Sequence, residues 1–321
     1  MNTLANTPPD ESSLASTSTE VNTSNLQIAQ PTALGSRLVG DPHADRNPHS
    51  TPSIGAASGG IALETPVDIG LQPDAPADAT QVAKKPKLRA KPKFHFPIPV
   101  KAVLLDLDGT LLDTAGDIAT AANMMRASLG FAPLDPALIK TYVGKGIANL
   151  VAKTLKDTVG EVGPTALKVA VANFERQYDK CSGDTSVPFP GVIDGLSALR
   201  DKGFRLGCVT NKAQRFTLPL LEKCGFGNTF ELVVSGDTLP EKKPHPLPLQ
   251  HAAAFFGCAT AELLLIGDSV NDAEAARAAG CPVFIVPYGY NEGQELRGLD
   301  CDAFIDDVPA ALKFVKVSTL H

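Results

Sequence analysis

Four aspartates stand just after apolar segments of the sequence, in positions where they could bind a metal ion and a phosphate group. Asp106 and Asp108 end one such segment and are separated by a single leucine. Asp268 ends another, and Asp272 follows four residues later. Carboxylates gathered at one place repel one another, and a hard divalent cation relieves that repulsion. Because oxygen ligands suit Mg²⁺, we predict a magnesium site.

The spacing of the first two aspartates favours phosphoryl transfer. In an extended strand, residues two apart point to the same side, so Asp106 and Asp108 can approach one substrate. Asp106 could attack phosphorus and form an aspartyl-phosphate, while Asp108 protonates the leaving alkoxide and later deprotonates water. Thr210, Lys243 and backbone N–H groups near Gly109 are candidates to stabilise the charge on the transferring phosphoryl group.

Buried parallel strands are the elements that would position these residues. Short apolar segments that stop at Asp, Thr or Gly are typical of such strands, and helical patterns fill most of the gaps between them. The predicted strands are 100–106, 204–210, 230–235, 262–268, 282–287 and, more weakly, 303–306. The predicted helices between them are 192–200, 213–223, 246–256 and 271–279. Ligands of such sheets bind beyond the carboxyl ends of the strands, where these polar residues stand.

The pattern changes between residues 113 and 190, where no strand-like segment occurs. Thr114 and Asp117 resemble a capping box, and Asp135 followed by Pro136 is typical of a helix start. One helical face is predicted from the spacing of Leu167, Val171, Phe174 and Tyr178. We therefore predict an α-helical insert at the carboxyl end of the first strand, where it can cover a ligand site.

The first 95 residues differ from the rest of the chain. They are rich in Pro, Ser, Thr and Ala and contain a basic segment at 84–93. Such a composition cannot compensate the entropy of folding by apolar burial. We predict an α/β protein in which a Rossmann-like parallel-sheet core (96–114 and 190–321) carries a helical cap (115–189) and follows a disordered extension (1–95).

Composition excludes several classes of protein. The formal net charge of −6 gives no basic surface for holding a nucleic acid specifically, although the segment 84–93 could contact a polyanion weakly. The six cysteines form no Cys-x-x-Cys pair, which argues against a zinc site or a disulfide-rich secreted scaffold. We expect no membrane span and no secretory signal, and hence a cytoplasmic protein. The oligomeric state stays open.

Four motifs in this order resemble those of the haloacid dehalogenase-like phosphatases. They are Asp-Leu-Asp-Gly-Thr-Leu-Leu-Asp-Thr at 106–114, Thr-Asn-Lys at 210–212, Lys-Pro-His-Pro at 243–246 and Gly-Asp-Ser-Val-Asn-Asp at 267–272. The resemblance implies Mg²⁺ held by Asp106, by the backbone carbonyl of Asp108 and by Asp268, with Asp272 as an acid behind these ligands. Thr210, Asn211 and Lys243 would bind the phosphate.

Within this family the chain is similar to the phosphoglycolate phosphatases. The similar segments are 188–192, 225–230, 288–293 and Tyr-Val-Gly-Lys-Gly at 142–146. The resemblance implies 2-phosphoglycolate as the substrate, and Lys145 is our candidate for binding its carboxylate. Other cationic residues of the insert that stay open for this role are Arg126, Lys153, Arg176 and Lys180. His245 is expected to cap a helix or face solvent, and Tyr288 and Tyr290 stay outside the catalytic set.

Several alternatives remain at this stage. The same chemistry could act on another sugar or sugar-acid phosphate or on pyrophosphate, or it could belong to a phosphomutase. A dehalogenase is disfavoured, because that branch of the family has no acid at the position of Asp108. From another class, the extension 1–95 could make the protein a binding or scaffold protein.

Overall fold

The computed structural model describes residues 93–296 and 298–318, so most of the predicted extension 1–95 and of its basic segment lies outside the described residues. A six-stranded parallel sheet forms the centre of the described part, in the order β6-β5-β2-β7-β8-β9. The strands are β2 (Ala102–Leu105), β5 (Arg205–Val209), β6 (Leu232–Val234), β7 (Leu263–Gly267), β8 (Val283–Ile285) and β9 (Ala303–Phe304). These six strands fall within the six predicted segments, and the predicted parallel α/β fold is confirmed.

Strand order explains where a ligand can bind. The chain leaves β2, adds β5 and β6 on one side, and then returns to place β7, β8 and β9 on the other side. The carboxyl ends of β5, β2 and β7 are therefore neighbours at the point where the direction of strand addition reverses. Ligand sites of open parallel sheets lie at such a point.

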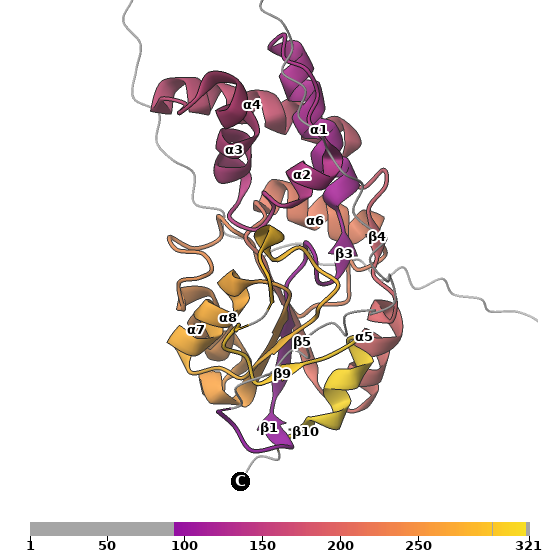
Figure 1. Cartoon of the computed structure of the whole chain (residues 1–321). Helices are drawn as coiled ribbons and strands as arrows, with labels where there is room; N and C mark the ends of the chain where they lie inside the picture. The colour runs from indigo at the N-terminus through magenta and orange to yellow at the C-terminus, as the bar shows by residue number, and fades with distance from the viewer. Residues whose placement is uncertain (1–92, 297, 319–321) are drawn as a thin grey trace, which may run out of the picture. The chain divides into compact units, whose positions relative to one another are not determined.

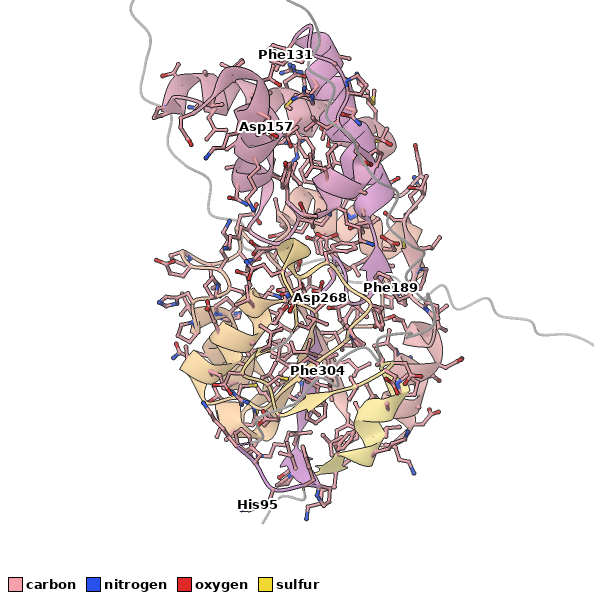
Figure 2. All side chains as sticks on the ribbon, viewed as in Figure 1. His95, Phe131, Asp157, Phe189, Asp268 and Phe304 are labelled. Atoms are coloured by element: carbon pink, nitrogen blue, oxygen red, sulfur yellow. The ribbon has the colours of Figure 1, made fainter. Side chains whose placement is uncertain are left out.

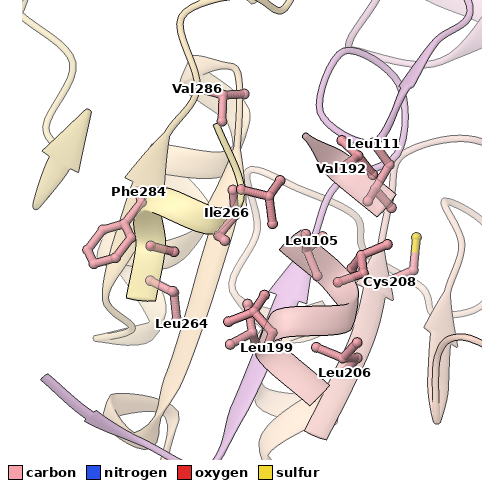
Figure 3. Close-up of a cluster of buried hydrophobic side chains, with 14 of the residues drawn as sticks. Leu105, Leu111, Val192, Leu199, Leu206, Cys208, Leu264, Ile266, Phe284 and Val286 are labelled. Atoms are coloured by element: carbon pink, nitrogen blue, oxygen red, sulfur yellow. The ribbon is translucent and has the colours of Figure 1, made fainter. Parts of the chain in front are cut away.

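Alternate side chains of the central strands enter two separate hydrophobic cores. Val103 and Leu105 of β2 belong to the first core, whereas Ala102 and Leu104 belong to the second. The first core is closed by α5 (Val192–Asp201) and α6 (Gln214–Lys223), and Figure 3 shows Val192 and Leu199 of α5 against strand residues. The second is closed by α7 (Leu247–Phe256) and α8 (Val270–Ala279). Helices on both faces explain why the strands are apolar without interruption.

Four helices and a short strand pair lie between β2 and α5. The helices are α1 (Ala115–Ser128), α2 (Pro136–Lys140), α3 (Ile147–Val159) and α4 (Pro164–Cys181). They share a third hydrophobic core, to which Phe174 and Tyr178 of the predicted helical face contribute, and they gather beyond β3 in Figure 1. Strand β3 (Leu112–Asp113) pairs antiparallel with β4 (Val187–Pro188). The expectation of no strand between 113 and 190 is wrong for β4, whose residues are exposed or half-buried and so show no pattern of a buried strand.

The predicted capping box at the start of α1 is also wrong. The side chain of Thr114 makes no cap hydrogen bond, and its hydroxyl instead donates to Oδ1 of Asp108 at 2.7 Å. The hydroxyl of Tyr290 caps this helix end in place of Thr114. It accepts from the N–H groups of Thr114 and Ala115 at 2.7 and 3.1 Å. At α2 the prediction is confirmed, since the Asp135 carboxylate accepts from a backbone N–H of the first turn.

The carboxylate of Asp117 instead joins the two chain segments that lead into and out of the helical insert. It accepts hydrogen bonds from the backbone N–H groups of Gly183, Thr185 and Ser186 and from the hydroxyls of Thr185 and Ser186. These bonds lower the pKa of Asp117 although burial opposes that shift. Asp117 thereby fixes the start of α1 against the segment that precedes β4.

A second small sheet lies at the opposite ends of the strands. Strand β1 (Ile98–Val100) pairs in parallel with β10 (Val315–Val317) and so brings the two ends of the described chain together. This pair was not predicted as strands. Within the described residues, no helix combines the length and apolar character that crossing a bilayer demands.

Candidate active site

The carboxyl ends of the three central strands bring the predicted acids together. Asp106 directly follows β2, and Asp268 directly follows β7. Figure 2 shows Asp268 at the side of the sheet that faces the helical insert. Phe131 and Asp157 are labelled in that insert. Asp272 lies in the first turn of α8 and is fully buried. Carboxylate oxygens of Asp106, Asp268 and Asp272 lie within 4.8 Å of one another.

Lys243 is the buried cation of this cluster. Its ammonium lies 2.9 Å from Oδ1 of Asp106 and 2.7 Å from Oδ1 of Asp272, and it also donates to the carbonyl of Val209 at 2.7 Å. One positive charge thus faces two carboxylates. Burial raises the pKa of Asp106 to about 6, and the neighbouring Lys243 limits that rise. The lysine therefore keeps Asp106 available as an anion near neutral pH.

The carboxyl of Asp268 is less compensated by positive charge than that of Asp106. Burial, followed by the charges of Asp272 and Asp106, raises its pKa to about 8. Its Oδ2 accepts from the backbone N–H of Tyr290 at 2.6 Å, and the hydroxyl of Thr110 lies 3.4 Å from its Oδ1. Two buried carboxyls with raised pKa values beside a third acid form a donor set that fits a hard divalent cation.

Two glycines make room for Asp268. A Cβ atom added to Gly109 would lie 2.3 Å from Oδ2 of Asp268, and one added to Gly289 would lie at the same distance from that oxygen. Gly109 also has a φ of +92°, which side-chain-bearing residues rarely adopt. A side chain at either glycine position would therefore collide with the Asp268 carboxylate.

Asp272 is held behind the other acids by its own hydrogen bonds. Its Oδ2 accepts from the backbone N–H and the hydroxyl of Ser269 at 3.1 and 2.8 Å. With Oδ1 bound to Lys243, both carboxylate oxygens have partners. This arrangement is compatible with the implied position of Asp272 behind the metal ligands, and that assignment stays a prediction.

The side chain of Asp108 is bound by different partners from those of the other acids. Its Oδ1 accepts from Thr114 and from the ammonium of Lys212, the latter at 3.1 Å, and Lys212 also reaches Oδ2 at 3.3 Å. Lys212 in turn donates to the hydroxyl of Tyr178 on α4 at 2.8 Å. The candidate acid/base is therefore linked to the helical insert by a buried lysine.

Lys212 is the site residue that the sequence reasoning missed. Its side chain is 5% exposed, and Asp108, with burial opposing, raises the pKa of its ammonium. Lys212 stands two residues after Thr210, within the second motif, so its position beside a strand end was a usable signal. Its partner could not be read locally, because 104 residues separate it from Asp108.

Thr210 and Asn211 occupy different environments. The Thr210 side chain is buried, and its hydroxyl accepts from the N–H of Lys212 at 3.2 Å. The side-chain amide of Asn211 donates to the carbonyls of Gly144 and Lys243, at 3.0 and 2.8 Å. Asn211 thus ties a loop of the insert to the loop that carries Lys243, in addition to its predicted place near the phosphate.

A cavity connects these groups to the helical insert. Its sheet side is lined by Asp106, Asp108, Thr210, Asn211, Lys212 and Asp268. Its helical side is lined mainly by apolar groups and glycines, among them Ile118, Val143, Gly144, Gly146, Leu150 and Phe174. Polar groups are therefore concentrated at one end of the cavity, and the insert supplies a mostly apolar cover.

Lys145 lies beside this cavity between two lining glycines. Its side chain is 47% exposed, and its ammonium lies 3.2 Å from Oε2 of Glu292, which follows β8. The other cationic candidates have different surroundings. Arg126 is buried and donates to the carbonyls of Ala132 and Thr154, whereas Arg176 is exposed.

The three residues left out of the catalytic set differ in what they contact. His245 is exposed, and its Nδ1 accepts from the N–H of Leu247 at 3.1 Å, which matches the expected helix-start or solvent-facing role. The hydroxyl of Tyr288 donates to the carbonyl of Thr110. Tyr290 joins Asp268 to the start of α1 through its N–H and its hydroxyl.

Comparisons with known proteins agree with this geometry. Residues 103–286 match the family model of the haloacid dehalogenase-like hydrolases. A phosphoglycolate phosphatase of Nitrosospira multiformis is 53% identical over 227 residues, which cover 70% of this chain and all of that protein. A phosphoglycolate phosphatase of Thiobacillus denitrificans is 50% identical over 68% of this chain and 97% of that protein.

A solved structure shares the fold as well. The crystal structure of a predicted phosphoglycolate phosphatase from Haemophilus somnus is 31% identical, with a TM-score of 0.63 over 67% of this chain and 97% of that one. The matching family model spans the strands that position the acid cluster, from β2 to β8. The chain belongs to the haloacid dehalogenase-like hydrolase family.

Proposed function

We propose that this protein is a Mg²⁺-dependent phosphatase that hydrolyses 2-phosphoglycolate to glycolate and phosphate. Relatives named phosphoglycolate phosphatase, about half identical over nearly their full lengths, support the substrate. The observation that carries the chemistry is the buried cluster of Asp106, Asp268 and Asp272 at the carboxyl ends of the strands. A cytoplasmic location is part of the proposal.

Asp106 is the proposed nucleophile. A carboxylate oxygen attacks phosphorus, the bond from phosphorus to the glycolate oxygen breaks, and an aspartyl-phosphate forms. Lys243 favours this reaction, because its ammonium keeps Asp106 ionised and adds positive charge beside the phosphoryl group. The hydroxyl and N–H groups around Thr210 and Gly109 are the proposed further donors to the phosphoryl oxygens.

Asp108 is the proposed acid and base. It gives its proton to the glycolate oxygen as that group leaves, and it then takes a proton from the water that attacks the aspartyl-phosphate. Thr114 and Lys212 hold the Asp108 carboxylate in one orientation. The second step breaks the bond between phosphorus and Asp106 and restores both aspartates.

Mg²⁺ would be held by the carboxylates of Asp106 and Asp268 and by the backbone carbonyl of Asp108. When bound, it would neutralise the substrate phosphate and the acids that surround it. The raised pKa values of Asp106 and Asp268 support this assignment, since burial and neighbouring acids disfavour their ionised forms and a bound cation would favour them.

Phosphate release from a panel of esters tests the proposal. The purified full chain would be assayed with 2-phosphoglycolate, sugar phosphates, a nucleotide and pyrophosphate, each with Mg²⁺ and with EDTA. We expect Mg²⁺-dependent turnover with a clear preference for 2-phosphoglycolate. A preference for another ester would replace the substrate, and turnover that persists in EDTA would overturn the metal assignment.

Truncation tests whether the extension 1–95 contributes to the reaction. A chain that begins at Pro97 should retain full activity, because the acids and the cavity lie in the residues that follow. Loss of turnover by a folded truncated chain would show that the extension takes part in the reaction.

A further inference from the structure

Glu292 is a buried carboxylate that lies between the sheet core and the helical insert. Its side chain is 2% exposed, and its backbone φ of +51° is rare for a residue with a side chain. Its Oε1 accepts from the side-chain amide of Asn271 at 2.8 Å. Burial of an unpaired charge is costly, so the partners of Oε2 decide what this residue does.

Two lysines of the insert face that second oxygen. The ammonium of Lys145 lies 3.2 Å from Oε2 of Glu292, and that of Lys153 on α3 lies 3.9 Å from it. Within residues 93–296 and 298–318, neither lysine has another carboxylate within 4.0 Å. Two positive charges therefore meet one negative charge, and the group of three carries a net charge of +1.

This group adjoins the cavity on both sides. Gly144 and Gly146, which flank Lys145, line the cavity, and so does Asn291, the neighbour of Glu292. The contact is close, because a Cβ atom added to Gly144 would lie 3.0 Å from Cγ of Glu292. The loop of Lys145 is held further by Lys242, whose ammonium donates to the carbonyl of Lys145 at 3.0 Å.

We propose that Lys153 and Glu292, together with Lys145, form the site that selects a substrate with a second negative charge. Glu292 is the positioning residue, since its Oε2 faces both ammonium groups beside residues that line the cavity, and the uncompensated charge attracts the substrate carboxylate. This inference rests on the proposed function and names the residues that would give it its specificity. It selects Lys153 from the cationic residues that the sequence left open and adds Glu292 to the predicted Lys145.

The magnitudes favour positioning over simple charge counting for Glu292. Removing its charge would raise the net charge, but the side chains of Lys145 and Lys153 are 47% and 36% exposed, so solvent screens much of that gain. Without the Glu292 carboxylate, the two lysine side chains would be mobile in the free protein and would lose rotamer freedom when substrate binds. We therefore expect loss of Glu292 to weaken selection of the anionic substrate.

The test compares 2-phosphoglycolate with 2-hydroxyethyl phosphate, in which a hydroxymethyl group replaces the carboxylate. For Lys153→Met in the full chain, we expect KM for 2-phosphoglycolate to rise roughly five- to tenfold. The KM for 2-hydroxyethyl phosphate, which has no carboxylate, should be unchanged. Glu292→Gln should reduce the ratio of kcat/KM values for the two esters by a similar factor. Equal effects on both esters, or an increased ratio, would overturn the proposal.

Matched controls and a salt series complete the experiment. Lys156 lies on the same helix, and its ammonium pairs at the surface with Glu161, so Lys156→Met and Glu161→Gln should leave the ratio unchanged. Added salt should lower the wild-type ratio but have little effect in a variant with both Lys145→Met and Lys153→Met. A wild-type ratio that salt does not change would count against an electrostatic site.

Loss of the fold must be separated from loss of selectivity. Melting temperatures identify a variant that loses its fold, and the Lys153→Met variant leaves the buried Glu292 in place. If the wild-type protein prefers another acidic ester, the proposed substrate fails, and the variants are then compared on that ester and its neutral analogue. If 2-phosphoglycolate is preferred but the ratio is unchanged in Lys153→Met, this inference fails alone.

Discussion

The ammonium of Lys212 lies 3.1 Å from Oδ1 of Asp108 and makes this lysine the partner of the proposed acid/base. The same ammonium donates to the hydroxyl of Tyr178, which α4 of the helical insert supplies. Asp108 therefore has its orientation fixed by a residue that also contacts the cover of the cavity. This relationship makes cap position and the geometry of Asp108 dependent on each other.

Replacement of Lys212 by Met should slow the reaction without removing the nucleophile. Methionine fills a similar volume but cannot orient Asp108, so we expect kcat to fall by roughly 10- to 100-fold. Steady-state rates with 2-phosphoglycolate measure this change. Lys202→Met is the control, because Lys202 is exposed at the C-terminal end of α5, away from the acid cluster. An unchanged kcat in Lys212→Met would remove the lysine from the catalytic geometry.

Substitution of the two proposed catalytic aspartates should give different defects. Asp106→Asn should abolish turnover, with a loss of roughly 1,000-fold or more, because no aspartyl-phosphate can form. Asp108→Asn should still be phosphorylated by an ester with a good leaving group but should release phosphate slowly. Rapid quenching and intact-protein mass measure the trapped phospho-enzyme. Phosphate on the Asp106→Asn protein would contradict the nucleophile assignment.

Mg²⁺ affinity should increase as pH rises. Protons compete with the cation for Asp106 and Asp268, whose pKa values are raised to about 6 and about 8. Below pH 8 the affinity should fall by roughly tenfold per pH unit while Asp268 alone competes. Titration calorimetry at pH 6 and pH 8 checks this, in buffers that also reveal proton release. Equal affinity at the two pH values would argue against these carboxylates as ligands.

The same acids predict how Mg²⁺ affects stability. A carboxyl whose folded pKa is raised from 3.8 contributes stability that is present below 3.8 and lost as pH rises towards 6 for Asp106 and 8 for Asp268. The metal-free protein should therefore lose stability over this range, and Mg²⁺ should restore it. Melting curves should show a larger Mg²⁺-induced increase in Tm at pH 8 than at pH 5.5. A larger increase at pH 5.5 would reverse the expected sign.

Asp117→Asn should destabilise the junction of the helical insert. Asparagine would leave several of the donors from Gly183, Thr185 and Ser186 without an acceptor, at a cost of about 3 kcal/mol in the free energy of unfolding. Urea denaturation measures the loss. Asp194→Asn is the control, because Asp194 is an exposed acid in the first turn of α5. Similar stability of the two variants would mean that Asp117 does not hold the junction.

Local pattern by itself determined most of the sheet and the positions of its acids. The central strands β2, β5 and β7 are almost entirely buried, so the apolar segment of each is continuous and ends where polar residues begin at the carboxyl edge. That is why β2, β5 and β7 could be predicted together with Asp106, Thr210 and Asp268. The short strands β3 and β4 were beyond this reasoning, because they are not buried throughout and so form no continuous apolar segment.

Tertiary structure decided which side chains meet. Thr114 and Asp117 have the spacing of a capping box, yet one binds Asp108 and the other binds the segment before β4. Tyr290 could replace Thr114 at the start of α1 because the fold brings it there across 176 residues. Lys212 and Glu292 likewise gain their roles from distant partners. Spacing along the chain specifies local elements, whereas a buried charge takes its partner from whatever the packed elements place beside it.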